Sequence, residues 1–179
     1  MTRLQDKVTI ITGAGAGMGE QMALLFAREG AKVVATDINM ENLEGVKSQI
    51  EEDGGQVVIG KCDISNESDV DATFKLAIDT YGRVDSLINN AGIMDKFDAV
   101  ADVDNEMWER ILHVNLFGNF YTMRAACRQF LTQQGRGNIV NIGSAAAVAG
   151  GRAGAAYTTA KHGMVGLTKN TAHMYAKEG

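Results

Sequence analysis

Short runs of β-branched and apolar residues alternate along the chain with longer segments in which apolar residues recur at helical spacing. The short runs are apolar at nearly every position, which is typical of strands that are covered on both faces of a sheet. Five strands are therefore predicted, at residues 8–11, 32–35, 57–59, 86–88 and 138–142. Helices are predicted at about 18–30, 40–53, 66–81 and 104–134, with a fifth from about 155 onward.

This alternation of strand and helix predicts βαβ units with right-handed crossovers, and hence a parallel sheet with helices on both faces. The fold class is α/β, and no internal repeat or linker interrupts the pattern. A chain of 179 residues, of which 45% are hydrophobic, has enough apolar surface for one core. One doubly wound domain is therefore predicted. Gly30 is expected to end its first helix, and Ser65 to cap its third.

The predicted sheet has five strands, whereas the common doubly wound dinucleotide fold has six, in the order 3-2-1-4-5-6. The sequence stops at Gly179, in or just after the fifth predicted helix. A sheet that ended at the fifth strand would leave an apolar edge exposed. We therefore expect further C-terminal strands, with residues 1–179 forming an incomplete domain.

Charge and composition exclude several classes of partner. The formal net charge is −5 and the basic residues are scattered, which argues against nucleic acid because phosphate binding needs a clustered basic face. No apolar run approaches the roughly 18 residues of a membrane helix, and the N-terminus lacks a signal-peptide core. Cys62 and Cys127 form no metal-binding or redox motif and are expected to be reduced. No membrane association, no metal and a cytoplasmic location are predicted.

A glycine-rich segment, Thr12–Gly19, follows the first strand and opens the first helix. It fits T-G-x-x-x-G-x-G through Gly13, Gly17 and Gly19, and does not fit G-x-G-x-x-G. Small residues there let the backbone approach a pyrophosphate, whose charge is met by N–H groups at the helix N-terminus. Asp37 ends the second strand at the usual distance for the acid that binds the adenosine ribose, although a solvated loop aspartate is the alternative. A carboxylate repels a 2′-phosphate, so the predicted cofactor is NAD.

Candidate chemistry lies near the end of the chain. Tyr157 and Lys161 are four residues apart, on one face of a predicted helix. Such a pair is usually only a surface contact. An ammonium about 4.5 Å from a phenol would favour the phenolate by roughly 3–4 kcal/mol at an effective dielectric near 20, which suits a general acid–base. Ser144 follows the fifth strand, where its hydroxyl could hydrogen-bond to a substrate oxygen, although alone it is more often a loop serine.

Together these residues resemble the short-chain dehydrogenases/reductases over the whole chain. Four motifs occur in the family's order: the Thr12–Gly19 loop, Asn89-Asn90-Ala91-Gly92 after the fourth strand, Ser144, and Tyr157-x-x-x-Lys161. Asn115 matches the position of the family's catalytic asparagine. The resemblance implies a Rossmann fold and an oxidoreductase that transfers hydride between NAD(H) and a small-molecule alcohol or ketone.

The resemblance also implies roles for the matched residues. Tyr157 would donate and accept the proton, while Lys161 would favour the phenolate and bind the nicotinamide ribose. Ser144 would orient the substrate oxygen, and Asn115 would hold a water that links Lys161 to solvent. Asp63 matches the position that hydrogen-bonds to the adenine ring. The implied cofactor-binding set is Gly13, Ala16, Gly17, Met18, Gly19, Asp37, Asp63, Ile64, Asn90, Ala91, Gly92, Tyr157 and Lys161.

The sequence is compatible with several substrates and assemblies. In the family the C-terminal part supplies much of the substrate pocket, so the sequence does not name the substrate. A 3-oxoacyl-carrier-protein reductase and a sugar or polyol dehydrogenase would look alike here. A non-catalytic NAD(H)-binding regulator is a different class, against which the intact catalytic set argues. Apolar residues lie on several faces of segment 104–134, and family members commonly pair through this helix, so we expect a homo-oligomer, either a dimer or a tetramer.

Overall fold

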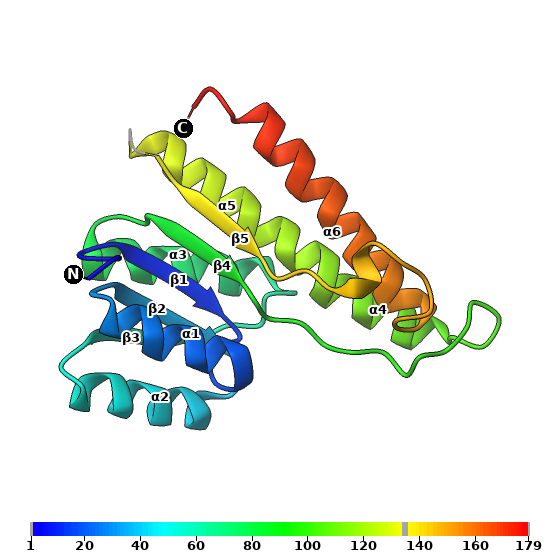
Figure 1. Cartoon of the computed structure of the whole chain (residues 1–179), viewed down its shortest axis with the longest axis horizontal. Coiled ribbons are helices and arrows are strands. Elements are labelled where there is room, and N and C mark those ends of the chain that lie inside the picture. The colour runs from blue at the N-terminus through cyan, green and yellow to red at the C-terminus, as the bar shows by residue number, and fades with distance from the viewer. Residues whose placement is uncertain (1, 134–135, 179) are drawn as a thin grey trace.

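The protein is described here by a computed structural model that covers residues 2–133 and 136–178. Its strands form one parallel sheet with the order β3-β2-β1-β4-β5, which is the order of the first five strands in the doubly wound dinucleotide fold (Figure 1). The predicted α/β fold with a single doubly wound domain is confirmed. The strands are β1 (Val8–Thr12), β2 (Lys32–Asp37), β3 (Gln56–Lys61), β4 (Ser86–Asn89) and β5 (Asn138–Asn141).

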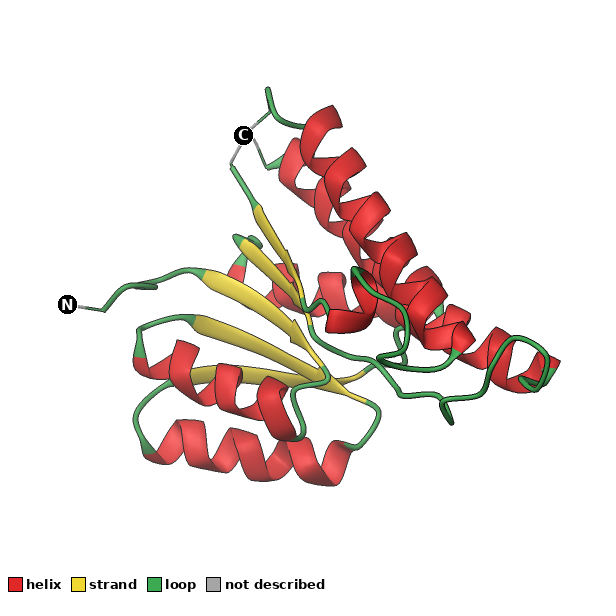
Figure 2. Cartoon of the chain, turned by 45° about the vertical axis from the view of Figure 1, so that its right-hand side comes forward, coloured by secondary structure: helices red, strands yellow, loops and turns green. Residues whose placement is uncertain are grey.

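Helices cover both faces of this sheet (Figure 2). The α-helices are α1 (Gly17–Arg28), α2 (Met40–Glu52), α3 (Glu67–Tyr81), α4 (Asn105–Leu112), α5 (Asn119–Thr132) and α6 (Ala155–Met174). Two separate apolar clusters show why the strands are apolar at nearly every position. One cluster joins Ile11 and Val33 to Leu24 of α1, and the other joins Ile10 to Phe74 of α3 and Ala126 of α5.

One predicted helix boundary, the start of α3, is wrong by one residue, and another, the end of α1, is confirmed. Ser65 is not the cap of α3, because Asn66 occupies the N-cap position and its side chain accepts a hydrogen bond from the Ser68 N–H. Ser65 instead donates to the Asp63 carboxylate through both its N–H and its hydroxyl. Gly30 follows the end of α1 with φ +89°, the left-handed conformation expected of a residue at this position.

The long helix predicted at 104–134 is interrupted. Between α4 and α5 lies a π-helical turn, η1 (His113–Gly118), which changes the backbone hydrogen-bonding pattern in the middle of the segment. Such turns occur frequently at functional sites, and Asn115 lies within this one. The helix ends at Thr132, and residue 134 of the predicted range lies outside the described residues.

The last helix, α6, packs on α4, η1 and η2 (Ala145–Ala147), a short 3₁₀ turn after β5. Its buried residues include Ala156 and Ala160, which lie against Ile111 of α4. This packing brings the first two turns of α6 to the edge of the sheet where the parallel strands end (Figure 1). Ligands of open α/β sheets bind at that edge.

Candidate active site

A cleft of about 840 Å³ lies at the carboxyl ends of the strands. It is lined by segments that follow β1, β2, β3 and β4, together with part of α4 and η1. Eight residues of the predicted cofactor-binding set meet in it: Gly13, Ala16, Asp37, Asp63, Ile64, Asn90, Ala91 and Gly92. Gly17 and Met18 line a neighbouring hollow with Ile142. Tyr157 and Lys161 are not among the residues that line either space.

The glycine loop is shaped at Gly13 and Gly19 by contacts that leave no room for a side chain. A Cβ on Gly19 would overlap the Gly13 carbonyl oxygen, and one on Gly13 would lie 2.9 Å from the Ala91 Cα. Ala16 is the N-cap of α1 and provides no side-chain hydrogen bond, so the first N–H groups of this helix have no side-chain cap. A helix N-terminus with such groups binds a phosphate readily. The loop therefore fits the pyrophosphate of a dinucleotide.

The loop is attached to the segment after β4 through Thr12 and Asn90. The Thr12 hydroxyl accepts hydrogen bonds from the Asn90 and Ala91 N–H groups, both at 3.1 Å. The Asn90 side-chain amide donates to the Thr12 and Gly13 carbonyl oxygens, both at 3.0 Å. These four bonds join two of the predicted cofactor motifs, which lie far apart in the sequence, into one surface.

Asp37 lies at the end of β2 beside this surface. Its Oδ2 atom accepts from the Gly15 N–H and its Oδ1 atom from the Asn39 N–H, each at 3.0 Å. The side chain is only half-buried and also lines the cleft. The structure thus places a carboxylate where the sequence predicted the ribose-binding acid.

Asn115 is fully buried in η1 and holds the segment after β4 from the other side. Its Oδ1 atom accepts from the Ile93 N–H at 2.9 Å, and its Nδ2 atom donates to the Ile93 carbonyl at 2.7 Å. Both polar atoms of the side chain are therefore bonded to the backbone, with one Nδ2 hydrogen and one Oδ1 lone pair left over. The Asn115 carbonyl oxygen accepts a hydrogen bond from Asn119 Nδ2 at 2.8 Å.

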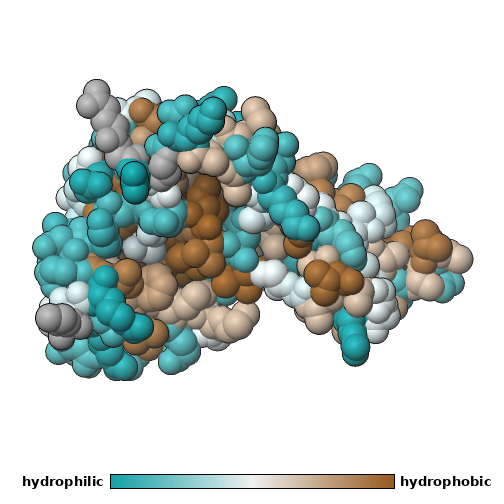
Figure 3. Space-filling view, turned by 45° about the horizontal axis from the view of Figure 1, so that its top comes forward, coloured by the Kyte–Doolittle hydropathy of each residue, from teal (hydrophilic) through white to brown (hydrophobic). Residues whose placement is uncertain are grey.

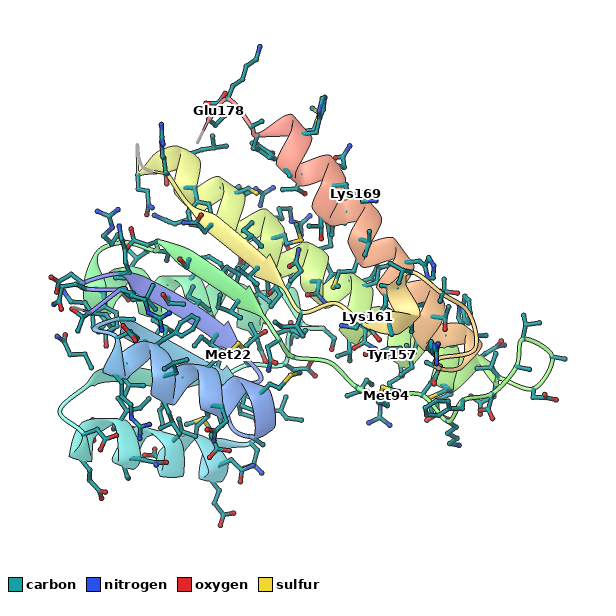
Figure 4. All side chains as sticks on the ribbon, in the orientation of Figure 1. Met22, Met94, Tyr157, Lys161, Lys169 and Glu178 are labelled. Carbon is teal, nitrogen blue, oxygen red and sulfur yellow. The ribbon has the colours of Figure 1, made fainter. Side chains whose placement is uncertain are left out.

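Tyr157 and Lys161 come together on α6, as their spacing predicted (Figure 4). The Lys161 ammonium nitrogen lies 5.6 Å from the centre of the Tyr157 ring and donates to the Ile142 carbonyl at 2.9 Å. Lys161 is 5% exposed, and this burial lowers the pKa of its ammonium group. Among the described residues it forms no ion pair with a carboxylate, so its charge is available to the phenol.

Ser144 follows β5 and is the N-cap of η2. Its Oγ atom accepts a hydrogen bond from the Ala146 N–H at 3.1 Å, which fixes the hydroxyl oxygen but leaves its proton available to donate. The side chain is half-buried. Ser144 therefore comes from the segment after β5, while Tyr157 and Lys161 come from α6, which packs on η2 at the same sheet edge as the cleft.

Sequence reasoning missed several residues of this region. Glu106, Glu109, Arg110 and His113 line the cleft, although no motif marks them, because they reach it only through the way α4 and η1 pack. Sequence reasoning also did not identify Asp95. Its carboxylate accepts hydrogen bonds from the backbone of the helix that carries Tyr157, and a loop aspartate gives no sequence signal of such a contact.

Comparison with known proteins places the chain in a family. The family model of the short chain dehydrogenases matches residues 7–179. The chain is 39% identical to 3beta-hydroxysteroid dehydrogenase 2 of Eggerthella lenta, over 98% of this chain and 68% of that protein. It is 37% identical to the cyclohexanol dehydrogenase of an Acinetobacter species, over 99% of this chain and 70% of that protein.

Solved structures agree with these relatives. NAD⁺-bound xylitol dehydrogenase superposes with a TM-score of 0.94 at 34% identity, over 99% of this chain and 68% of that one. Levodione reductase also gives a TM-score of 0.94, at 32% identity, over 98% of this chain and 69% of that one. The chain belongs to the short-chain dehydrogenase family. It is an NAD(P)-dependent oxidoreductase of alcohols and ketones. The predicted choice of NAD over NADP stays a prediction.

Proposed function

We propose that this short-chain dehydrogenase uses NAD(H) in preference to NADP(H), and that Tyr157, Lys161, Ser144 and Asn115 form its catalytic set for a secondary alcohol or the corresponding ketone. The observation that carries the proposal is the convergence of two groups of residues at one sheet edge. The glycine loop and Asp37 border the dinucleotide-sized cleft, and the Tyr157–Lys161 pair lies where β5 and α6 meet beside it.

In this proposal the cofactor is held by the loop, by Asp37 and by the segment after β4. The uncapped N–H groups of α1 would bind the pyrophosphate, and Asp37 would accept hydrogen bonds from the adenosine ribose. The same carboxylate would repel a 2′-phosphate, which supports NAD over NADP. Asp63 and Ile64 would border the adenine, and Asn90, Ala91 and Gly92 the nicotinamide end. When bound, NAD supplies the carbon that accepts hydride from the alcohol.

The chain's own residues would move the proton. The Tyr157 phenolate oxygen would accept the proton of the alcohol hydroxyl during oxidation, and would return it during reduction. The buried Lys161 ammonium would favour that phenolate. The free hydroxyl proton of Ser144 would hydrogen-bond to the substrate oxygen and hold it in line with Tyr157. Asn115 and the π-helical turn would keep the segment after β4 in place, and would hold the water that connects Lys161 to solvent.

The relatives suggest where to look for the substrate. Three of the four proteins named above are dehydrogenases of a hydroxysteroid, of cyclohexanol and of xylitol, all of which carry secondary hydroxyl groups. A cytoplasmic location and assembly into a dimer or tetramer are part of the same proposal. The oligomer is supported by Phe117 and Phe120, two aromatic side chains of η1 and α5 that are each 39% exposed.

The test combines a substrate screen with one substitution. Cyclohexanol, xylitol and a 3β-hydroxysteroid are each incubated with NAD⁺, and formation of NADH is followed by its absorbance. Tyr157→Phe deletes only the oxygen that transfers the proton, so turnover should fall by roughly 10²–10⁴-fold, while NADH affinity, measured by fluorescence titration, stays the same.

Tyr175→Phe is the matched control, because Tyr175 is an exposed tyrosine just beyond the end of α6, and it should behave as wild type. NADH binding without turnover of any alcohol would favour a regulator over an enzyme. Full activity in Tyr157→Phe would contradict the proposed role of Tyr157 in proton transfer.

A further inference from the structure

Asp95 lies in the connection between β4 and α4 and is 8% exposed. Both of its carboxylate oxygens accept hydrogen bonds from backbone N–H groups. Oδ1 accepts from Phe97 at 3.1 Å and from Gly154 at 3.0 Å, and Oδ2 accepts from Tyr157 at 2.9 Å. None of the ion pairs formed by the described residues includes Asp95. Three backbone N–H groups, two of them from another segment, therefore stabilise this buried carboxylate.

Two of these three contacts are those of a helix cap. Gly154 is the N-cap of α6 and has no side chain to bind the free N–H groups of the first turn. In a capping box, the side chain of the N-cap residue accepts from the third helical N–H, and a second side chain accepts from the N-cap N–H. Here one carboxylate, 59 residues earlier in the chain, accepts from both Gly154 and Tyr157. Its negative charge also suits the positive end of the helix dipole.

The backbone around Asp95 is shaped for this contact. A Cβ on Gly154 would lie 2.5 Å from Asp95 Oδ2, so only glycine leaves room for the carboxylate at this distance. The Ala155 N–H donates to the Asp98 carbonyl at 2.9 Å, so the β4–α4 connection also binds the first residue of α6. Phe97 adopts φ +65°, a conformation uncommon for a residue with a side chain, while its N–H is bound by Asp95.

Asp95 also joins the two halves of the site. Two residues before it, Ile93 is held through both backbone polar groups by the Asn115 side chain, and Gly92 borders the cofactor cleft. On its other side Asp95 binds the N–H group of Tyr157 itself. Figure 1 shows the connection running past the first turn of α6, where the Tyr157 N–H donates to Asp95. The cofactor side and the proton-donor side are thus linked by one carboxylate.

We propose that Asp95 is a positioning residue, whose carboxylate caps α6 from the β4–α4 connection and thereby sets where Tyr157 stands relative to the cofactor cleft. This inference rests on the proposed role of Tyr157. Asp95 does not contact the reacting atoms in this assignment. Its effect reaches the reaction through the backbone of Tyr157, so its loss should lower the rate of chemistry and leave cofactor binding intact.

The experiment compares Asp95→Ala and Asp95→Asn with Asp102→Asn in the full-length protein. Asp102 is an exposed acid of the same connection and serves as the matched control. The substrate is whichever of cyclohexanol, xylitol and the 3β-hydroxysteroid turns over fastest. Misplacement of a reacting group by about 1 Å can cost about 10²-fold in rate. We therefore expect kcat to fall about 10- to 100-fold in Asp95→Ala, with the dissociation constant of NADH within about twofold of wild type.

Asp95→Asn should lie between Asp95→Ala and wild type, because its one carbonyl oxygen can still accept from Gly154 or Tyr157 while its amide cannot. Gly154→Ala provides an independent route to the same loss, since the added methyl group displaces the Asp95 carboxylate. If both changes act on one contact, the double variant Asp95→Ala/Gly154→Ala should be no slower than the slower single variant.

Three results would overturn the proposal: a kcat within twofold of wild type in Asp95→Ala, a fall in kcat matched by an equal loss of NADH affinity, or additive effects in the double variant. Hydrogen exchange of the Gly154 and Tyr157 amides tests the Asp95 cap without any enzymatic activity. It therefore distinguishes failure of the Asp95 proposal from failure of the proposed function. If the wild type binds NADH but turns over no alcohol, the proposed function fails. In that case, faster exchange of these two amides in Asp95→Asn than in Asp102→Asn still shows the cap, and unchanged exchange contradicts it.

Discussion

At the scale of single residues, Lys161 is a buried lysine whose ammonium donates to the Ile142 carbonyl and lies 5.6 Å from the centre of the Tyr157 ring. Burial of a cation without a carboxylate partner is unfavourable, and it lowers the pKa of this lysine. Ionisable groups with shifted pKa values cluster at functional sites. The position of Lys161 therefore supports its proposed action on the Tyr157 phenol.

Lys161→Ala should move the alkaline limb of alcohol oxidation to higher pH. In the proposed mechanism the ammonium stabilises the negative charge that develops on the substrate side of the proton transfer, so its removal should move the rate profile to higher pH. The measurement is a pH–rate profile with saturating NAD⁺, and Lys169→Ala, an exposed lysine on the same helix (Figure 4), is the control. A midpoint that stays in place or falls would show that the two side chains are not coupled.

Asp37→Ala should narrow the preference for NAD(H) over NADP(H). The wild-type carboxylate lies at the end of β2 on the cleft wall, where it would bind the ribose hydroxyls and repel a 2′-phosphate. Its removal weakens binding of NAD(H) and relieves the repulsion of NADP(H), so the ratio of the two dissociation constants should move toward one. Calorimetric titration of both cofactors measures this ratio. Glu44→Gln, which removes an exposed charge from α2, should leave it unchanged, and tighter NADP(H) binding by wild type would contradict the assignment.

At the scale of structural elements, the glycine loop and α1 form one unit, and its glycines serve different purposes. Gly13 and Gly19 are enclosed by other atoms of the chain, whereas a Cβ on Gly17 would meet nothing within 4 Å. Gly17 has φ +58°, which residues with a side chain rarely adopt. Its role is therefore to turn the backbone and to keep the space at the N-terminus of α1 open.

Gly17→Val should abolish NADH binding in a protein that still folds. The side chain would enter open space where the pyrophosphate is proposed to lie, and the left-handed backbone would add strain of about 1–3 kcal/mol. Fluorescence titration measures the affinity, and circular dichroism with a thermal melt measures the fold. Gly166→Ala, a helical glycine with no neighbour near the added methyl group, is the control and should bind NADH normally. Wild-type affinity in a folded Gly17→Val protein would contradict the loop assignment.

The elements that sequence could predict are those with a local signal. The five strands were recognisable because both faces of the sheet are covered, which makes residues such as Ile10 and Ile11 both apolar. The cap of α3 was misplaced by one residue because Ser65 and Asn66 are both good capping residues, and the choice depends on the Asp63 carboxylate that binds Ser65. The π-helical turn at Asn115 has no local signal in the sequence.

At the scale of the whole molecule, the predicted cofactor residues could be named because the family keeps them in recognisable motifs, and eight of them line one cleft. Asp95 could not be named, because its function arises only when a loop after β4 packs against a helix about sixty residues later. The same holds for Arg110 and His113, which reach the cleft through the packing of α4 and η1. Long-range packing of this kind is what a single sequence leaves undetermined.

The sheet leaves one side of the molecule open. No described strand pairs with the outer edge of β5, and a groove of about 690 Å³ runs beside it between α5 and α6, lined in part by Phe130, Leu131 and Val140. Apolar surface is gathered in a hollow at the centre of Figure 3. An unpaired edge strand with apolar side chains is a template for association with another chain. The predicted apolar edge is thus present in residues 1–179.

A polypeptide of residues 1–179 alone should therefore associate with itself as its concentration rises. Light scattering after size exclusion, at several concentrations, measures the mass. Val140→Lys should weaken the association, because Val140 is 48% exposed on β5 and a lysine on an edge strand opposes pairing. Val100→Lys places the same charge on a side chain that is 82% exposed in the β4–α4 connection, away from the edge, and should leave the association unchanged. A monomer at every concentration, or equal effects of the two lysines, would show that the β5 edge is not the contact.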